Sequence, residues 1–187
     1  MQRFNISLLI IVMLLGTVSK VQPAWADGPY RGKVIDAETK EPIEGAVAVA
    51  VWMRRIFNPI QGQTGFAEVK EAITDKNGEF VIPGYKWTSI FFTYGVRPPR
   101  IFIFSPGYGF FPEYQISPNP KQSNAALLEP FKTHALVELP KLKTKEERIK
   151  VYNSYDLGIS IPHEKTPNYM RTKNFERKEL GFAGEEE

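Results

Sequence analysis

The sequence contains no cysteine and only two histidines, His134 and His163. Without cysteine the chain can form no disulfide, carry no lipid on a lipobox cysteine, and build no zinc site that needs thiolates. Neither histidine stands in a His-x-x-Glu or His-Glu-x-x-His pattern, so no metallopeptidase site is indicated. We expect no metal and no cofactor, and we interpret both histidines as ordinary surface residues.

Catalytic motifs are also lacking. There is no Gly-x-Ser-x-Gly elbow, and no spacing pairs a nucleophile with a base. The stretch from Asp75 to Gly78 has some likeness to a calcium loop, but the later glutamate and the intermediate ligands are missing, so we interpret it as a turn. We expect a protein that is not an enzyme. A hydrolase would need a cleft that holds a histidine beside a carboxylate.

The N-terminus has the pattern of a secretory signal peptide over residues 1–26. A basic start is followed by the apolar residues 6–18 and by Ala24-Trp25-Ala26, an Ala-x-Ala cleavage site. Cleavage after Ala26 would make Asp27 the first mature residue. The alternative is an uncleaved membrane anchor, but the apolar run is short for a span of about 20 residues.

Export without cysteine suits the periplasm or outer surface of a Gram-negative bacterium better than a eukaryotic secretory route. The leader holds Arg3 and Lys20 and no acid, so the mature chain keeps 22 basic and 21 acidic residues, a net charge of +1. This balance argues against nucleic acid as a partner and against strong electrostatic membrane binding. Membrane contact is expected only through an uncleaved signal segment.

Strand-like stretches dominate residues 27–140. They cover residues 30–36, 46–52, 66–74, 100–104 and 134–139. The second of them alternates alanine and valine, which is typical of a strand with two apolar faces in the middle of a sandwich. Residues 53–65 and 116–131 are expected to be loops, because glycine, proline, asparagine and serine interrupt them.

The chain is organised around a predicted hairpin at residues 73–83. Asn77-Gly78 supplies the positive φ angles of a two-residue turn, and Asp75 can accept hydrogen bonds from the turn's amides. Ile73 precedes the turn and Phe80 and Ile82 alternate after it. We therefore expect one apolar face of the hairpin to pack on residues 46–52.

Two helices are expected in a C-terminal extension, residues 141–187. Thr144 and Glu147 form a capping box, Thr166-Pro167 is a second helix start, and Gly181 can end that helix. The second helix has only a thin apolar stripe, so it is either lightly docked or frayed. The stripe consists of Tyr169, Met170, Phe175 and Leu180.

Three motifs carry a family resemblance. Residues 32–49 combine a Gly-x-Val strand and an Asp/Thr turn with Pro42-Ile43-Glu44-Gly45-Ala46; residues 74–80 read Thr-Asp-x-x-Gly-x-Phe; residues 104–108 end in Gly-Tyr. Together they resemble carboxypeptidase regulatory-like domains over about residues 30–108. The resemblance implies a mainly β fold, an antiparallel transthyretin-like (Ig-like) β-sandwich. The loop at 53–65, an aromatic-rich segment at 85–114 and the helical extension depart from the family.

The aromatic-rich segment is the candidate ligand site. One interpretation is an exposed platform for sugar rings or a protein partner, rimmed by Arg54, Arg55, Arg97 and Arg100. The other is that these aromatics fill the core, as expected for Phe102 and Phe104 on one strand face. The speculative ligand-binding residues are Trp87, Tyr94, Tyr108, Phe110, Phe111 and Tyr114.

Three functional hypotheses follow. The first is an exported, non-catalytic module that binds or scaffolds a glycan or protein in the cell envelope. The second is a structural accessory subunit that docks through its C-terminal helices. The third is a hydrolase of the transthyretin-like type, which would use His134 or His163.

Overall fold

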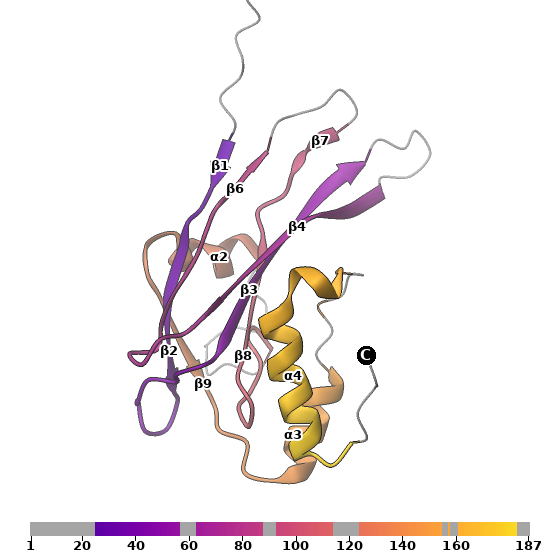
Figure 1. Ribbon diagram of the computed structural model, residues 1–187. Helices are drawn as coiled ribbons and strands as arrows, with labels where there is room; N and C mark the ends of the chain where they lie inside the picture. The colour runs from indigo at the N-terminus through magenta and orange to yellow at the C-terminus, as the bar shows by residue number, and fades with distance from the viewer. Residues whose placement is uncertain are drawn as a thin grey trace, which may run out of the picture.

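The computed structural model describes residues 25–56, 63–87, 93–113, 124–154, 157 and 161–182. Figure 1 shows the arrangement of the elements. In chain order they are β1 (Trp25–Asp27), β2 (Tyr30–Asp36), β3 (Val47–Ile56), β4 (Gln63–Ile73), β5 (Glu79–Ile82), β6 (Tyr85–Trp87), β7 (Thr93–Val96), β8 (Arg100–Phe104), α2 (Asn124–Thr133), β9 (Ala135–Leu139), α3 (Lys145–Ser154), the 3-10 helix η1 (His163–Lys165) and α4 (Pro167–Glu179). The prediction of a mainly β chain with C-terminal helices is confirmed.

The strands form a three-stranded sheet, β5-β2-β9, a four-stranded sheet in which β4, β7 and β8 all pair with β3, and the short pair β1-β6. Every pairing is antiparallel except β2 with β9, where Lys33 lies beside Leu136 in a parallel ladder. A purely antiparallel arrangement was therefore a wrong prediction for β9. A parallel neighbour needs a crossover, and here the whole chain between the two strands supplies it.

The turn after Ile73 connects the two larger sheets. Asp75 Oδ1 accepts hydrogen bonds from the N–H groups of Asn77 (2.8 Å) and Glu79 (2.9 Å), as expected. The flanking strands do not pair with each other, however, because β4 pairs with β3 and β5 pairs with β2. The predicted hairpin is therefore wrong in its pairing. Ile73 is also 47% exposed rather than part of an apolar face.

Only Gly78 takes a positive φ (76°) in this turn, so the type I′ geometry expected for Asn-Gly does not form. Its carbonyl accepts the N–H of Val34 at 2.9 Å, and a Cβ on Gly78 would collide with the Val34 carbonyl oxygen. The close approach of the turn to β2 explains why glycine is needed.

Thr74 joins two of the sequence motifs, the one at residues 74–80 and the one at residues 42–46. Its buried hydroxyl donates to the carbonyl of Ile43 (2.7 Å) and accepts the N–H of Ala46 (2.8 Å). Its backbone adds two bonds, to Gly45 and to Ala46. The Thr-Asp turn and the Ile-x-Gly-Ala turn are thus one hydrogen-bonded unit.

Strand β3 is buried on both faces, as its alternation predicted. The inner cluster lies on its alanine side, where residues of the three-stranded sheet and α2 also pack; its members include Ala46, Ala48, Ala50, Trp52, Tyr30, Val34, Phe80, Ile82, Ile103, Phe111, Phe131, Val137 and Leu139. The helix-side cluster lies on its valine side and includes Val47, Val49, Val51, Val69, Phe102, Phe104, Phe110, Val151, Leu157 and Tyr169. Phe80 and Ile82 share the inner cluster with the alanines, as expected.

Helix α2 occupies part of the region that was expected to be a loop. Its buried Phe131 packs against Phe80 and Phe111, with ring centroids 6.2 and 5.5 Å apart. Pro130 lies inside the helix, and the preceding residues are rich in proline and asparagine. These residues disfavour helix locally, so it is tertiary burial of one helix face that stabilises α2.

The expected loop at residues 53–65 was too long. β3 continues to Ile56 and β4 begins at Gln63, and the two strands stay paired past an irregularity between Trp52 and Met53. In Figure 1 this paired end of the four-stranded sheet extends beyond the helices. Arginine, glycine and threonine interrupt the apolar alternation by which a strand is recognised in a sequence. The sequence therefore did not indicate this solvent-exposed pair of strands, which backbone hydrogen bonds hold together.

The helix ends follow the predicted chemistry. Thr144 Oγ1 accepts the Glu147 N–H (3.1 Å), and Glu147 Oε2 accepts the Thr144 N–H (3.2 Å), which completes the capping box. At the end of α4, Gly181 has φ of 78° and its N–H donates to Lys178, while Phe182 N–H donates to Arg177. These two bonds form a Schellman motif.

Helix α4 is held firmly rather than lightly docked or frayed. The Glu71 carboxylate of β4 accepts the N–H groups of Asn168 (2.7 Å) and Tyr169 (3.0 Å) in its first turn. Glu176, 2% exposed, forms a bidentate pair with Arg148 of α3 at 2.8 and 2.6 Å. Of the predicted stripe, Tyr169 and Leu180 are buried and Phe175 is exposed. None of the helices in these described ranges has the length and hydropathy of a membrane span.

Removing residues 141–187 is expected to prevent folding, because it exposes Val47, Val49, Val51 and Phe104. Such a strip of apolar surface favours aggregation. Soluble yield and a cooperative thermal transition measure this. A matched control lacking only residues 183–187 keeps every described contact and should behave as the full chain. A soluble chain that lacks residues 141–187 and still unfolds cooperatively would contradict the expectation.

Replacing Thr74 with valine keeps the shape but leaves the Ile43 carbonyl and the Ala46 N–H without their partner. We expect a loss of about 1–3 kcal/mol in the free energy of unfolding, the usual cost of unpaired buried polar groups. Thr74→Ser retains the hydroxyl and is the matched control. Chemical denaturation of both variants measures the difference, and equal stability of the valine variant and the wild type would refute this account.

Candidate functional site

The aromatic residues proposed as a ligand platform do not share one exposed surface. Phe110 is 1% exposed in the helix-side cluster, and Phe111 is 4% exposed in the inner cluster. Trp87 is half-buried in β6, and Tyr94 lies in β7. The side chain of Tyr94 and the whole of Tyr114 lie outside the described part of the structure. Phe110 and Phe111 thus serve as core residues, the alternative that the sequence left open.

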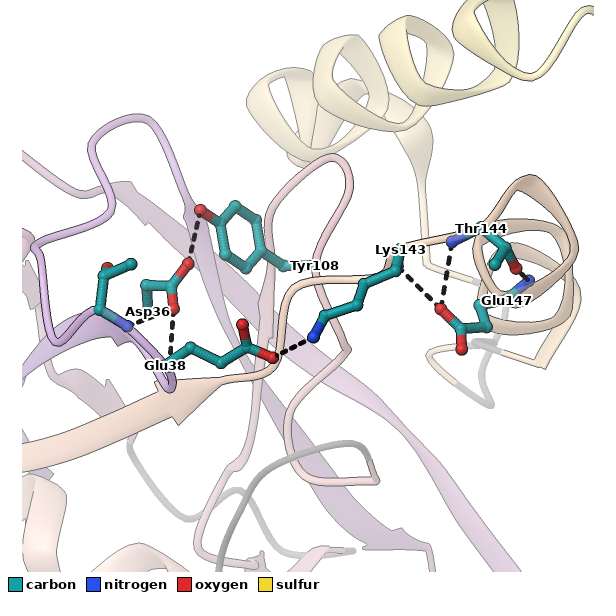
Figure 2. Close-up of polar contacts among 7 residues, drawn as sticks. Asp36, Glu38, Tyr108, Lys143, Thr144 and Glu147 are labelled. Carbon is teal, nitrogen blue, oxygen red and sulfur yellow. Dashed lines mark hydrogen bonds and ion pairs between the residues drawn. The ribbon is translucent and has the colours of Figure 1, made fainter.

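Tyr108, the sixth candidate, belongs to a hydrogen-bonded group centred on Asp36 (Figure 2). The Tyr108 hydroxyl donates to Asp36 Oδ2 at 3.2 Å, and the N–H groups of Glu38 (2.7 Å) and Thr39 (3.0 Å) donate to Asp36 Oδ1. Asp36 is 5% exposed. Its carboxylate therefore has three donors and little contact with water.

These contacts shift the pKa of both side chains. The hydrogen bond from Thr39, followed by those from Glu38 and Tyr108, lowers the pKa of Asp36 although its burial acts in the opposite direction. Burial, and then the hydrogen bond to Asp36, raises the pKa of Tyr108. Both shifts favour an ionised aspartate that accepts from a neutral tyrosine, so neither group is prepared to exchange protons with a substrate near neutral pH.

The Asp36 group connects three distant segments. It fixes the turn after β2 and holds Tyr108 from the turn after β8. Beside it, Glu38 pairs with Lys143 at 2.8 Å, just before the capping box that starts α3. Figure 2 shows this succession from Asp36 to Glu147. The arrangement is that of a structural joint between the strands and the C-terminal helices.

The histidines form no active-site cleft. His134 Nε2 lies 2.6 Å from Glu79 Oε2, but the two side chains are 52% and 40% exposed. His163 is exposed in η1. Within the described ranges no group of three or more histidine, aspartate and glutamate side chains converges as a metal would require. The Asp75 carboxylate accepts backbone N–H groups in its turn, which is the structural role first assigned to it.

A small pocket lies beside β8 and α2. Its volume is about 30 Å³, and its lining includes Pro99, Arg100, Phe111, Pro112 and Leu128. A pocket of this size accommodates water-sized molecules rather than a sugar ring. It therefore offers no enclosed site for a substrate.

The exposed end of the four-stranded sheet has a different character. Arg54 and Arg55 of β3, Arg97 after β7 and Arg100 of β8 are all exposed there. The sequence suggested them only as a rim for aromatic rings; the strand pairing brings them together. Arg100 lies opposite Val51, and the Arg97 N–H donates to the Met53 carbonyl at 2.8 Å.

No family model, curated protein or solved structure matches this chain. The family resemblance of the motifs is therefore judged by the contacts they make. The hydrogen bonds of Thr74 and Asp36 show that these motif residues hold turns and connect segments of the chain.

Replacing Asp36 with asparagine removes the charge but keeps an acceptor oxygen. We expect a loss of about 1 kcal/mol at pH 7, the difference between a charged and a neutral acceptor. Since the folded pKa lies below the ordinary value, the contribution is present above about pH 4 and is lost as pH falls through the folded pKa. Denaturation curves of wild type and variant should therefore converge in acid. Glu38→Gln, at an exposed pair, is the control, and a pH-independent gap would contradict the assignment.

Proposed function

We propose that this chain is an exported, non-catalytic module of the cell envelope with a transthyretin-like β-sandwich fold related to carboxypeptidase regulatory-like domains. The facing sides of its two larger sheets share the inner cluster, which supports a sandwich. Gly45 and Gly78 both take positive φ angles, 78° and 76°, at the glycines of the two motifs. The Thr74 bonds give a physical reason for the motifs to occur together.

One observation carries the non-catalytic assignment: the buried acidic side chains in the described part of the chain all have structural partners. Asp36 holds a turn and Tyr108, and Glu176 pairs with Arg148. The half-buried Glu71 caps α4. A general acid or base must instead face a substrate within hydrogen-bond reach. Binding or scaffolding, of a glycan or an envelope protein, is the function left to the exposed surface.

Cleavage of the predicted signal peptide would shorten the N-terminal strand. β1 pairs Trp25 with Trp87 and Asp27 with Tyr85. Cleavage after Ala26 would leave only Asp27 of β1, so β6 would lose most of its partner. N-terminal sequencing of the protein from the envelope fraction distinguishes a mature chain that starts at Asp27 from an uncleaved, anchored one.

A second candidate function is an accessory subunit that docks through its C-terminal helices. The inner faces of α3 and α4 pack within this chain, so a partner would have to use the outer face of α4. Phe175 is 55% exposed there, in the turns that also carry the exposed Arg171 and Lys178. This exposed aromatic residue is the observation that favours docking.

The two candidates predict different results for one pair of experiments. A binding module should retain ligands on a glycan array or in an envelope pull-down when Phe175 is replaced by alanine, because that side chain is away from the exposed sheet end. An accessory subunit should lose its partner with the same variant. The matched control is Phe175→Leu, which keeps an apolar side chain. If the array and the pull-down both show no ligand, the proposed binding role fails.

A further inference from the structure

Among the described residues, no ion pair compensates the positive charge at one end of the four-stranded sheet. The six ion pairs found among the described residues use Lys40, Lys132, His134, Lys143, Arg148 and Lys165 as their cations. Arg54, Arg55, Arg97 and Arg100 take part in none of those pairs. The chain is therefore near-neutral in total charge but has a local excess of positive charge at this end of the sheet.

The sequence explains this excess. Residues 45–67 and 80–112 contain no aspartate or glutamate. These two acid-free stretches supply β3, β7 and β8, which lie together in the four-stranded sheet. Glu68, the first acid after the first stretch, is already paired with Lys165 at 2.9 Å. The arginines thus have no neighbouring carboxylate along their own strands.

Three of the arginines lie around the half-buried Met53 of β3. Phe66 of β4 lies opposite Met53, and Lys165 Nζ lies over the Phe66 ring at 5.5 Å. We call Met53, with Arg55, Arg97 and Arg100, the arginine face. Arg100 lies over the Phe102 ring at 4.9 Å, on the helix side of the sheet. Strand alternation places Arg55 on the same side as Met53 and places Arg54 on the other.

The spacing of these side chains allows a repeated anion to bind along the sheet. Arg100 lies opposite Val51, and Arg55 is four residues further along β3. At about 3.3 Å per residue the two positions are roughly 13 Å apart along the strand, so each side chain can meet a separate acidic group of one polymer. Arginine is also the side chain that best matches planar anions by paired N–H donors.

The described residues of the arginine face favour a polar polymer over a lipid surface. The exposed large apolar side chains of the described residues are Ile73, Val81, Leu136 and Phe175, and none belongs to the arginine face. Interfacial membrane binding needs such side chains beside the cations. We propose that the arginine face binds an anionic polysaccharide, whose acidic groups pair with Arg55, Arg97 and Arg100 while sugar rings lie over Met53.

This inference deepens the proposed function and rests on it for the class of ligand. Binding of the full chain is measured with two anionic polymers, polygalacturonate for carboxylate and dextran sulfate for sulfate, with neutral dextran and phosphatidylglycerol vesicles as comparisons. We expect binding to at least one anionic polymer, weakened by salt, and little to dextran or vesicles. The triple variant Arg55→Gln, Arg97→Gln, Arg100→Gln should bind at least about tenfold more weakly.

The matched control removes the same charge elsewhere, by Lys150→Gln, Arg171→Gln and Lys178→Gln at exposed positions of α3 and α4. It should keep the affinity of the wild type. Thermal unfolding of both triple variants verifies that they fold. The proposal is overturned if neither anionic polymer binds, if the control loses as much affinity, or if only vesicles bind. Equal binding of neutral dextran by all variants would overturn the arginine face but leave a glycan-binding module standing.

Discussion

The structure depends on the burial of β3 from both sides. Its alanines leave room on one side for the large rings of the inner cluster, and its valines fill the other side beneath α3 and α4. A strand with two apolar faces cannot sit at the surface, so the helices are a required layer of the fold. The polar joints, at Glu71 and at the Arg148–Glu176 pair, hold that layer in register.

The elements that the sequence predicted well are those set by local chemistry. The bounds of β8, the alternation in β3 and the capping box at Thr144 follow from residue type and spacing within a few positions. The errors concern partners. The sequence of a five-residue strand such as β9 does not indicate whether it pairs parallel or antiparallel. The sequence of the Asp75 turn does not indicate whether the two strands beside it pair with each other. Both were decided by burial of side chains far apart in the sequence.

The candidate site was harder to predict, for the same reason. Aromatic residues serve packing and binding equally well, and only tertiary structure shows that Phe110 and Phe111 are buried. The arginines were visible in the sequence, but β3 and β8 had to pair before Arg55 and Arg100 became neighbours. One signal was available earlier: both contributing stretches contain arginines and no acidic residue.

The parallel pairing of β2 with β9 also bears on when the chain can fold. Lys33 and Leu136 are adjacent in the sheet but are separated by most of the chain. Closing so long a loop is entropically costly, and folds rich in such distant pairings form slowly. One edge of β2 can therefore pair only after β9 has been synthesised, although its other edge can pair with β5 earlier.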